Sequence, residues 1–502
     1  MQPRFSLLPR RKSYLFLTLT VLLAANLAWA QSSASHPVCQ VRVAANEVIV
    51  SNRERVETGF HVLPPNVIPA PQYWPYFAWT DTPLGVLRND DGSYTFFGSD
   101  GGCHKDCTTT KPRWGSVTIS HGSLDHPLGE PLGDPVPPPY EFVFPDTHDI
   151  PQIIDYAGGG PVYRVPEGEP GAGSLLLVYH TEQPANPFWS RTGLAKSTDE
   201  GYTWQDLGTI LTVPHPFDPT GASGVGENPL VPYLDPVTHQ KYFYIFFPHF
   251  CWTAVAACTD FTYISVARVP YQELLITAAA GGSASNLFRK YYQGKWDQPA
   301  IGGLASETFP GVTAETDGNF QIVWSDYRKR FIAMTDNSQE IAYGESLDGT
   351  YWPPMQVVYT EPNLNATVGY ANAVGLGEDP SLPGSTFYSY YTSSPIPDYP
   401  WEPATVNRLT ITTAASVTGL VPASATAGSS AFTLTVNGEG FVSASSVFWN
   451  GTPLATTYVS PALLTAHVPA SGLEHAGQAN IVVSNPDPCG GLSNLEEFTI
   501  LR

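Results

Sequence analysis

Short apolar strands separated by turn residues recur along most of the chain. Between residues 79 and 410 a short apolar strand, a Gly or Asp turn, an aromatic-rich strand and a strand ending near a Ser-Asp turn follow one another five times. The second strands of the five units are expected at residues 94–97, 175–179, 242–247, 331–334 and 387–391. Their spacing of about seventy residues is that of a four-stranded blade with its loops.

The apolar strands are continuous, whereas a sheet with one wet face would alternate apolar and polar positions. Continuous strands suit a radial array, in which neighbouring blades cover both faces of each sheet. We therefore predict a five-bladed β-propeller over residues 67–411, preceded by an N-terminal segment at 31–66. Residues 40–50 alternate well enough to form a strand that helps to close the ring. The one helical pattern lies at residues 270–280.

After Thr413 the composition shifts to small residues, and apolar and polar positions alternate regularly. Short strands are expected at residues 433–441, 446–452, 464–469, 479–486 and 497–500. Turn signals about every ten residues are typical of an immunoglobulin-like β-sandwich. The predicted fold class is all-β, a five-bladed β-propeller followed by a C-terminal immunoglobulin-like sandwich over residues 415–502.

The N-terminus has the pattern of an export signal. Four basic residues precede an apolar run at 14–27, and Ala-Trp-Ala at 28–30 suits cleavage. We expect a signal peptide at 1–30 and a secreted protein, with the periplasm or cell surface as other destinations, and no membrane span. Removing residues 1–30 takes the formal net charge from −21 to −25, because all four charges lost are positive. A chain with this much negative charge repels phosphate backbones, so we expect no nucleic-acid partner.

Six cysteines in an exported chain favour disulfides. Cys103 with Cys107 and Cys251 with Cys258 could each close a small loop, whereas Cys39 and Cys489 lie in different predicted domains. A metal site at Cys103 and His104 lacks a second ligand pair nearby. We expect no cofactor, although the acidic loop at 146–149 is either a structural calcium loop or a solvated surface loop.

Two turns and the C-terminal segment resemble known families. Residues 197–204 match the Ser-x-Asp-x-Gly-x-Thr-Trp form of the Asp-box of sialidases and related propellers, and residues 346–352 resemble its shortened variant in five-bladed glycosidases. In those families the motif fastens a hairpin on the rim and carries no chemistry. Residues 415–502 resemble an IPT/TIG domain, through Gly-x-Gly-Phe at 438–441 and Trp-Asn-Gly at 449–451.

Three acids open the first three units, namely Asp81, Asp155 and Glu227. Their order resembles that of the arabinanase and xylosidase group of five-bladed glycosidases. The resemblance implies that Asp81 is the general base, that Asp155 orients and tunes, and that Glu227 is the general acid. Hydrolysis of a glycosidic bond needs one protonated and one ionised carboxyl group. Each acid could instead cap a strand or turn.

Other residues near these openings could bind a ligand. Tyr-Arg-Val-Pro at 163–166 resembles a sialidase motif whose arginine holds the substrate carboxylate, which makes Arg164 a candidate, although the family's second arginine and acid/base aspartate have no obvious counterparts. Trp79, Trp324 and Tyr370 could stack on sugar rings or pack between blades.

These observations favour a secreted carbohydrate-active protein, a glycoside hydrolase with paired carboxylates at the mouth of the propeller channel. A non-catalytic carbohydrate-binding or adhesion protein is the main alternative, and a sialidase-like exo-glycosidase is a lesser one. In each case the expected partner is a polysaccharide or glycan.

Overall fold

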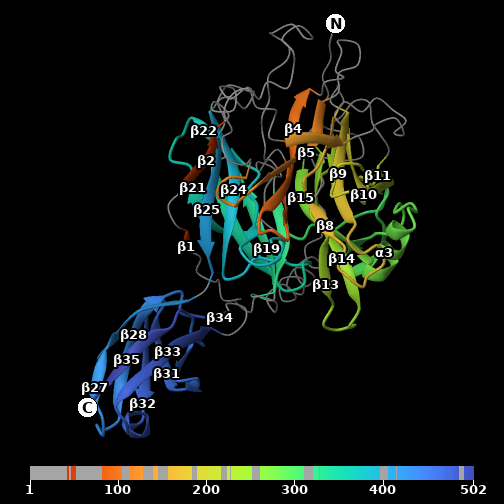
Figure 1. Cartoon of the computed structure of the whole chain (residues 1–502). Helices are drawn as coiled ribbons and strands as arrows, with labels where there is room; N and C mark the ends of the chain where they lie inside the picture. Colours follow the sequence, from red (N-terminus) through yellow and green to blue (C-terminus); the bar gives the residue numbers. More distant parts are fainter. Residues whose placement is uncertain are drawn as a thin grey trace, which may run out of the picture. The chain divides into compact units, whose positions relative to one another are not determined.

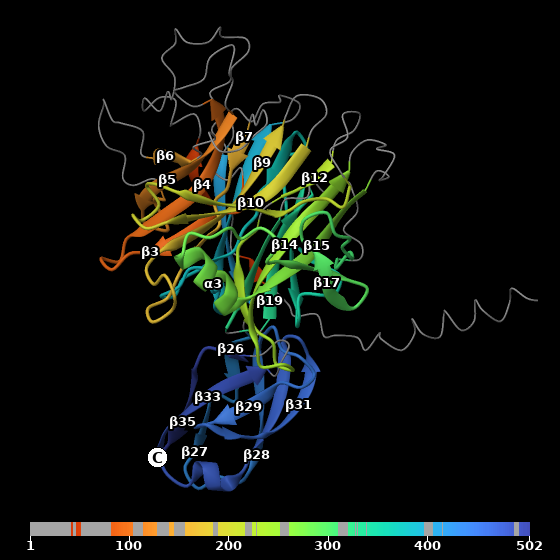
Figure 2. The ribbon, with the colours of Figure 1, turned by 90° about the vertical axis from the view of Figure 1, so that its right-hand side faces the viewer.

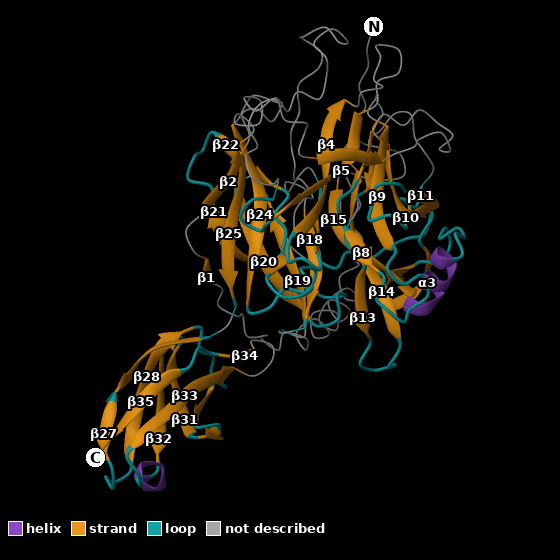
Figure 3. Cartoon of the chain, in the orientation of Figure 1, coloured by secondary structure: helices purple, strands orange, loops and turns teal. Residues whose placement is uncertain are grey.

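Strands and turns make up nearly all of the part of the chain that is described (Figure 3). The computed structural model describes residues 42–43, 47–51, 82–103, 114–127, 140–144, 156–183, 189–215, 223–226, 228–251, 261–309, 320–326, 328, 330–337, 339–395, 405–413, 415–485 and 491–502. Among these residues no helix is long and apolar enough to cross a membrane. The predicted all-β class is confirmed.

The first two blades are antiparallel sheets in sequence order (Figure 1). Blade 1 consists of β3 (Gly85–Arg88), β4 (Tyr94–Cys103), β5 (Trp114–Gly122) and β6 (Tyr140–Phe144). The inner strand of blade 2 is split into β7 (Tyr156–Gly158) and β8 (Val162–Arg164), and both parts pair with β9 (Leu175–Gln183). The sheet continues with β10 (Trp189–Ser197) and β11 (Gln205–Leu211).

Blade 3 also has a split inner strand and carries the helix. Its strands are β12 (Ser223–Val225), β13 (Val231–Leu234), β14 (Lys241–Cys251), β15 (Phe261–Pro270), β16 (Arg289–Tyr292) and β17 (Lys295–Pro299). Helix α3 (Tyr271–Ala279) follows β15 directly, as the pattern at 270–280 predicts (Figure 2). Lys196 of blade 2 donates a hydrogen bond to the carbonyl of Ala278 at 2.9 Å, which ties the helix to the neighbouring blade.

Blade 4 is a regular sheet of β18 (Phe320–Ser325), β19 (Arg330–Asp336), β20 (Glu340–Ser346) and β21 (Gln356–Thr360). Blade 5 combines both ends of the domain. It contains β22 (Ala366–Gly369), β23 (Val374–Gly375), β24 (Thr386–Pro395) and β25 (Thr405–Thr412). Strands β1 (Arg42–Val43) and β2 (Glu47–Ser51) pair with β25, so the predicted closing strand is confirmed and the propeller begins before residue 67.

Five separate apolar cores join the blades into a ring. Phe97 of blade 1 and Leu177 of blade 2 belong to one apolar cluster. A larger cluster between blades 2 and 3 contains Val178 and Phe247. Further clusters join blades 3 and 4 and blades 4 and 5, and the ring closes where Phe96 packs with Tyr390. Because each inner sheet is covered on both faces, its strands are apolar at successive positions.

The two Ser-x-Asp turns lie in hairpins between the third and fourth strands of blades 2 and 4, as predicted. In the first, the Asp199 carboxylate accepts hydrogen bonds from the backbone N–H and hydroxyl of Thr203, at 2.9 and 2.6 Å. In the second, Asp348 accepts from the backbone N–H of Thr350 at 2.8 Å. These bonds hold the turns closed.

Residues 415–502 form a separate β-sandwich with its own core. One sheet contains β26 (Ser416–Val421), β28 (Phe432–Glu439), β31 (Ala455–Ser460) and β32 (Leu463–Val468). The other contains β27 (Ser424–Thr426), β29 (Ser446–Trp449), β30 (Thr452–Pro453), β33 (Gly477–Asn485), β34 (Gly491–Leu492) and β35 (Glu496–Leu501). A short 3₁₀ helix spans Ala470–Leu473. Trp449 and Phe498 pack between the sheets.

Candidate functional site

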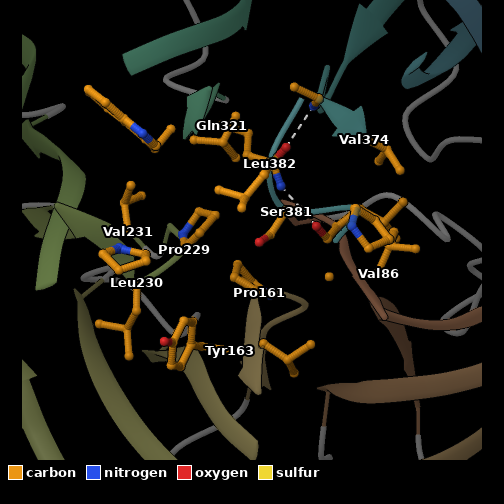
Figure 4. A pocket seen from close by; sticks show the side chains of 18 residues that line it. Val86, Pro161, Tyr163, Pro229, Leu230, Val231, Gln321, Val374, Ser381 and Leu382 are labelled. Carbon is orange, nitrogen blue, oxygen red and sulfur yellow. Dashed lines mark hydrogen bonds between the residues drawn. The ribbon is translucent and has the colours of Figure 1, made fainter. Parts of the chain in front are cut away.

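The inner strands of all five blades line one pocket on the propeller axis (Figure 4). Blades 1 and 2 contribute Leu84, Gly85, Val86, Pro161, Val162 and Tyr163; blade 3 contributes Pro229, Leu230, Val231 and Pro232; blades 4 and 5 contribute Gln321, Val323, Trp324, Ala373, Val374, Pro380, Ser381 and Leu382. None of these side chains is charged. The cavity volume is about 30 Å³, which is room for very few water molecules.

A buried amide connects three of the inner strands at this pocket. Gln321, only 2% exposed, donates from Nε2 to the carbonyl of Leu84 at 2.8 Å. Its Oε1 accepts from the backbone N–H of Ala373 at 2.7 Å. Blades 1, 4 and 5 are therefore joined by one side chain whose donor and acceptor are both used.

A second buried amide joins blade 3 to blade 4. Asn228 donates to the carbonyl of Phe320 and accepts from the N–H of Ile322, both at 2.9 Å, as a neighbouring strand would. Between blades 1 and 2 the backbones themselves meet, since a Cβ added to Gly85 would lie 2.0 Å from the carbonyl oxygen of Gly160. We call Gly85, Gly160, Asn228, Gln321 and Ala373, which carry these contacts, the collar.

The predicted catalytic acids Asp81, Asp155 and Glu227, together with Trp79, lie outside the described residues. Their immediate neighbours in the chain are described. Thr82 is buried next to the collar, and Tyr156 begins the inner strand of blade 2. The segments that carry the three acids thus lead directly into collar strands of three successive blades.

The chain is fixed on both sides of Glu227. Gly226 donates its N–H to the carbonyl of Pro248 at 3.3 Å, and its own carbonyl accepts from the Thr192 hydroxyl at 2.8 Å. On the other side Asn228 is 1% exposed and held by its two bonds to blade 4. Both neighbours of Glu227 in the chain are therefore anchored to other strands.

Arg164 is engaged by a carboxylate of the same blade. Its guanidinium makes two hydrogen bonds to Glu200, at 3.1 and 2.6 Å, and Glu200 belongs to the hairpin turn between β10 and β11. Hydrogen bonding to Arg164 holds the pKa of the Glu200 carboxyl below its ordinary value. Tyr163, the preceding residue, lines the axial pocket.

The two described aromatic candidates occupy different positions. Trp324 lines the axial pocket, donates from its indole Nε1 to Asp326 at 3.0 Å, and packs against Tyr233 and Phe331. Tyr370 lies between β22 and β23, three residues before Ala373 of the collar, and its φ is +61°. Tyr370 is only partly buried.

His249 is a buried residue of this region that sequence reasoning missed. It pairs with Val225, two residues before Glu227, is 2% exposed, and packs with its ring centroid 4.7 Å from that of Tyr263. Burial, with smaller contributions from Lys290 and His215, lowers the pKa of His249 to about 3. A single histidine in an apolar strand gives no sequence signal that distinguishes it from ordinary core.

This shift predicts loss of stability in mild acid. The folded-state pKa of His249 lies below the unfolded value of 6.5, so the unfolded chain alone takes up the proton as the pH falls from about 6.5 towards 3. The free energy of unfolding should drop by about 1.4 kcal/mol per pH unit in that window. Melting curves at pH 7 and 5 should show a smaller drop for His249→Leu than for wild type. The exposed His239→Asn should keep the full drop, and equal drops in all three proteins would contradict the assignment.

The disulfide and calcium predictions fall on residues or side chains that the structure does not describe. In the described part of the chain, no cluster of three His, Cys, Asp or Glu side chains could hold a metal ion. The acidic loop at 146–149 and Cys39, Cys107, Cys258 and Cys489 lie outside the described residues. Cys103 and Cys251 end β4 and β14, but their side chains also lie outside the described part, so both disulfides stay predictions.

Comparison with known proteins identifies the C-terminal module. Residues 415–500 match the IPT/TIG domain family, so the predicted domain is present. No curated protein matches the chain.

The likeness of the chain to solved structures is weak, as three of them illustrate. A protein of unknown function from Dyadobacter fermentans is 13% identical, with 74% of this chain and 99% of that chain covered and a TM-score of 0.36. A GH93 α-L-arabinofuranosidase of Fusarium graminearum, solved with arabinobiose, is 13% identical, with coverages of 74% and 98% and a TM-score of 0.34. A Penicillium chrysogenum α-L-arabinanase, also with arabinobiose, is 12% identical, with coverages of 86% and 99% and a TM-score of 0.32.

Proposed function

We propose that this chain is an exported glycoside hydrolase whose active site lies at the mouth of the propeller, on the side from which the inner strands enter the collar. One observation carries the proposal. The chain segments that follow Asp81, Asp155 and Glu227 all run into the wall of a single axial pocket. We infer that the carboxylates of these three residues, which precede strands of blades 1, 2 and 3, converge on that axis.

The proposed roles follow from the chemistry. Glu227 is the general acid, which protonates the leaving oxygen, and Asp81 is the ionised base or nucleophile. Asp155 orients the pair. The collar is uncharged, and the amides of Asn228 and Gln321 are hydrogen-bonded. A general acid needs surroundings of this kind, because burial away from water disfavours the ionised form of a carboxyl group.

The aromatic candidates Trp79 and Tyr370 would supply stacking surfaces at the mouth, whereas Trp324 lines the pocket below it. The Arg164 guanidinium already donates two hydrogen bonds to Glu200, so a ligand carboxylate would have to compete with that partner. An acidic sugar of the sialic type would need a free guanidinium, so we favour an uncharged sugar.

The test is a screen of the purified mature protein on chromogenic arabinosides, xylosides, galactosides and sialosides. We expect hydrolysis of at least one uncharged glycoside and none of the sialosides. Retention of the protein on a polysaccharide gel without hydrolysis of any substrate would overturn the enzyme and favour the carbohydrate-binding alternative. Export is tested by N-terminal sequencing of the secreted protein, which should begin at Gln31.

A further inference from the structure

The strand break in blade 5 holds an aromatic residue in a strained backbone conformation. Gly369 pairs with Thr392 and Val374 pairs with Tyr388, so four residues, 370–373, face only three on β24. Tyr370 begins this bulge with φ of +61°. Left-handed backbone is unfavourable for a bulky side chain and persists only where the surroundings impose it.

Neighbouring residues bind several of the backbone groups of the bulge. The N–H of Ala371 donates to Asp336 Oδ2 at 3.2 Å, and Asn372 Nδ2 donates to the carbonyl of Tyr370 at 3.3 Å. Asn372 itself exchanges two bonds with Tyr390, and Ala373 is bound by Gln321 of the collar. The bulge is thus fastened to blade 4 as well as to its own blade.

Asp336 is the one acidic residue among these partners of the bulge. It is the last residue of β19, is 2% exposed, and reaches across the interface between blades 4 and 5. Burying a carboxylate is costly unless it is well bonded. Through its bond to the Ala371 N–H, a buried carboxyl group of blade 4 therefore holds the residue that follows the strained tyrosine.

Blade 3 is interrupted at the corresponding place. There Val225 pairs with His249, Val231 pairs with Tyr244, and Glu227 lies between them, followed by the buried Asn228. In blade 5, Val374 begins the second part of the inner strand, as Val231 does in blade 3. Tyr370 lies four residues before Val374, and Glu227 lies four residues before Val231. Equivalent positions in a radial array lie at the same level around the axis, so Tyr370 lies at the level at which the proposed function requires Glu227.

We propose that Asp336 is a positioning residue, which holds the Tyr370 backbone in its left-handed conformation so that the ring stacks against the sugar at the propeller mouth. This inference rests on the proposed function for its ligand. The stacking surface is an aromatic ring with an apolar face, and it suits the C–H face of an uncharged pyranose or furanose.

The experiment compares Tyr370→Asn, Tyr370→Phe, Asp336→Ala and Asp336→Asn on the chromogenic glycoside that wild type cleaves. Asn tolerates left-handed backbone, so Tyr370→Asn should melt no lower than wild type while its KM rises about tenfold or more, the loss expected for about 1.4 kcal/mol of stacking. Tyr370→Phe should keep the wild-type KM. Asp336→Ala should raise KM, and Asp336→Asn, which keeps an acceptor for the Ala371 N–H, should restore it.

Two results would overturn the inference. One is an unchanged KM in Tyr370→Asn, and the other is a fall in its melting temperature together with the rise in KM, which would make the ring ordinary packing. If Asp336→Ala does not fold, an Asp336→Asn protein whose KM rises as in Tyr370→Asn would equally reject the positioning role.

A further measurement distinguishes failure of the proposed function from failure of this inference. Calorimetric titration with arabinotriose and xylotriose needs no catalysis. Binding that is lost in Tyr370→Asn, in a protein that hydrolyses nothing, would reject the enzyme and keep the inference. Hydrolysis with an unchanged KM in Tyr370→Asn would keep the enzyme and reject the inference. A protein that neither binds nor hydrolyses these sugars would contradict the proposed function and the inference.

Discussion

Replacing Glu227 by Gln should lower kcat on glycosides with poor leaving groups by about 10²–10⁴-fold, the range that a positioned general acid contributes. The amide keeps the shape of the carboxyl group but has no proton of suitable acidity to give. Aryl glycosides with activated leaving groups depart without protonation, so their loss should be smaller. The measurement is kcat on a series of substrates whose leaving groups differ in pKa.

The matched control for this variant is Glu273→Gln. Glu273 lies in the first turn of helix α3, is exposed, and is far along the chain from the collar. It should leave the kinetics unchanged. Equal losses on good and poor leaving groups in Glu227→Gln would remove the general-acid role, and full activity would show that the acid lies elsewhere.

The repeat structure could be predicted because short stretches of sequence determine its strands and turns. Each aromatic strand expected at the centre of a unit is the second strand of a blade, from β4 to β24. The same holds for the sandwich, in which each expected strand is found within a few residues. Apolar runs and turn residues act over short distances, so a single sequence reveals them.

The collar could not be predicted, because its bonds join residues that are distant in the sequence. Gln321 bonds to Leu84 across 237 positions, and Asn228 bonds to Phe320 across 92. Amides are common on surfaces, and nothing next to Gln321 or Asn228 in the chain shows that they are buried. The left-handed conformation of Tyr370 could not be predicted for the same reason, because the residue after it is bonded to Asp336 of another blade.

Arg164 illustrates the limit of a motif. Its setting in Tyr-Arg-Val-Pro resembles a carboxylate-binding arginine, and in the structure it does bind a carboxylate, that of Glu200 in the same blade. A ligand would have to compete with that intramolecular partner. The role proposed for Arg164 therefore depends on a conformational change that the motif alone does not imply.

Gly85→Ala should destabilise the propeller by about 3 kcal/mol and also reduce activity. The new Cβ would lie 2.0 Å from the Gly160 carbonyl oxygen and 2.9 Å from the Val162 nitrogen, and both are backbone atoms of blade 2 that cannot rotate away. Blades 1 and 2 would have to separate, at the cost typical of overpacking or more. The segments leading to Asp81 and Asp155 enter these same strands, so the two carboxyl groups would be displaced relative to Glu227.

Differential scanning calorimetry tests this prediction with internal controls. Gly377→Ala is the matched variant, because Gly377 is exposed and an added Cβ there would meet nothing within 4 Å. The sandwich has a core of its own, so its transition should be unchanged in both proteins. A propeller transition in Gly85→Ala that equals that of Gly377→Ala would mean that the blades accommodate the methyl group. Blade spacing at Gly85 would then not be what fixes the geometry of the mouth.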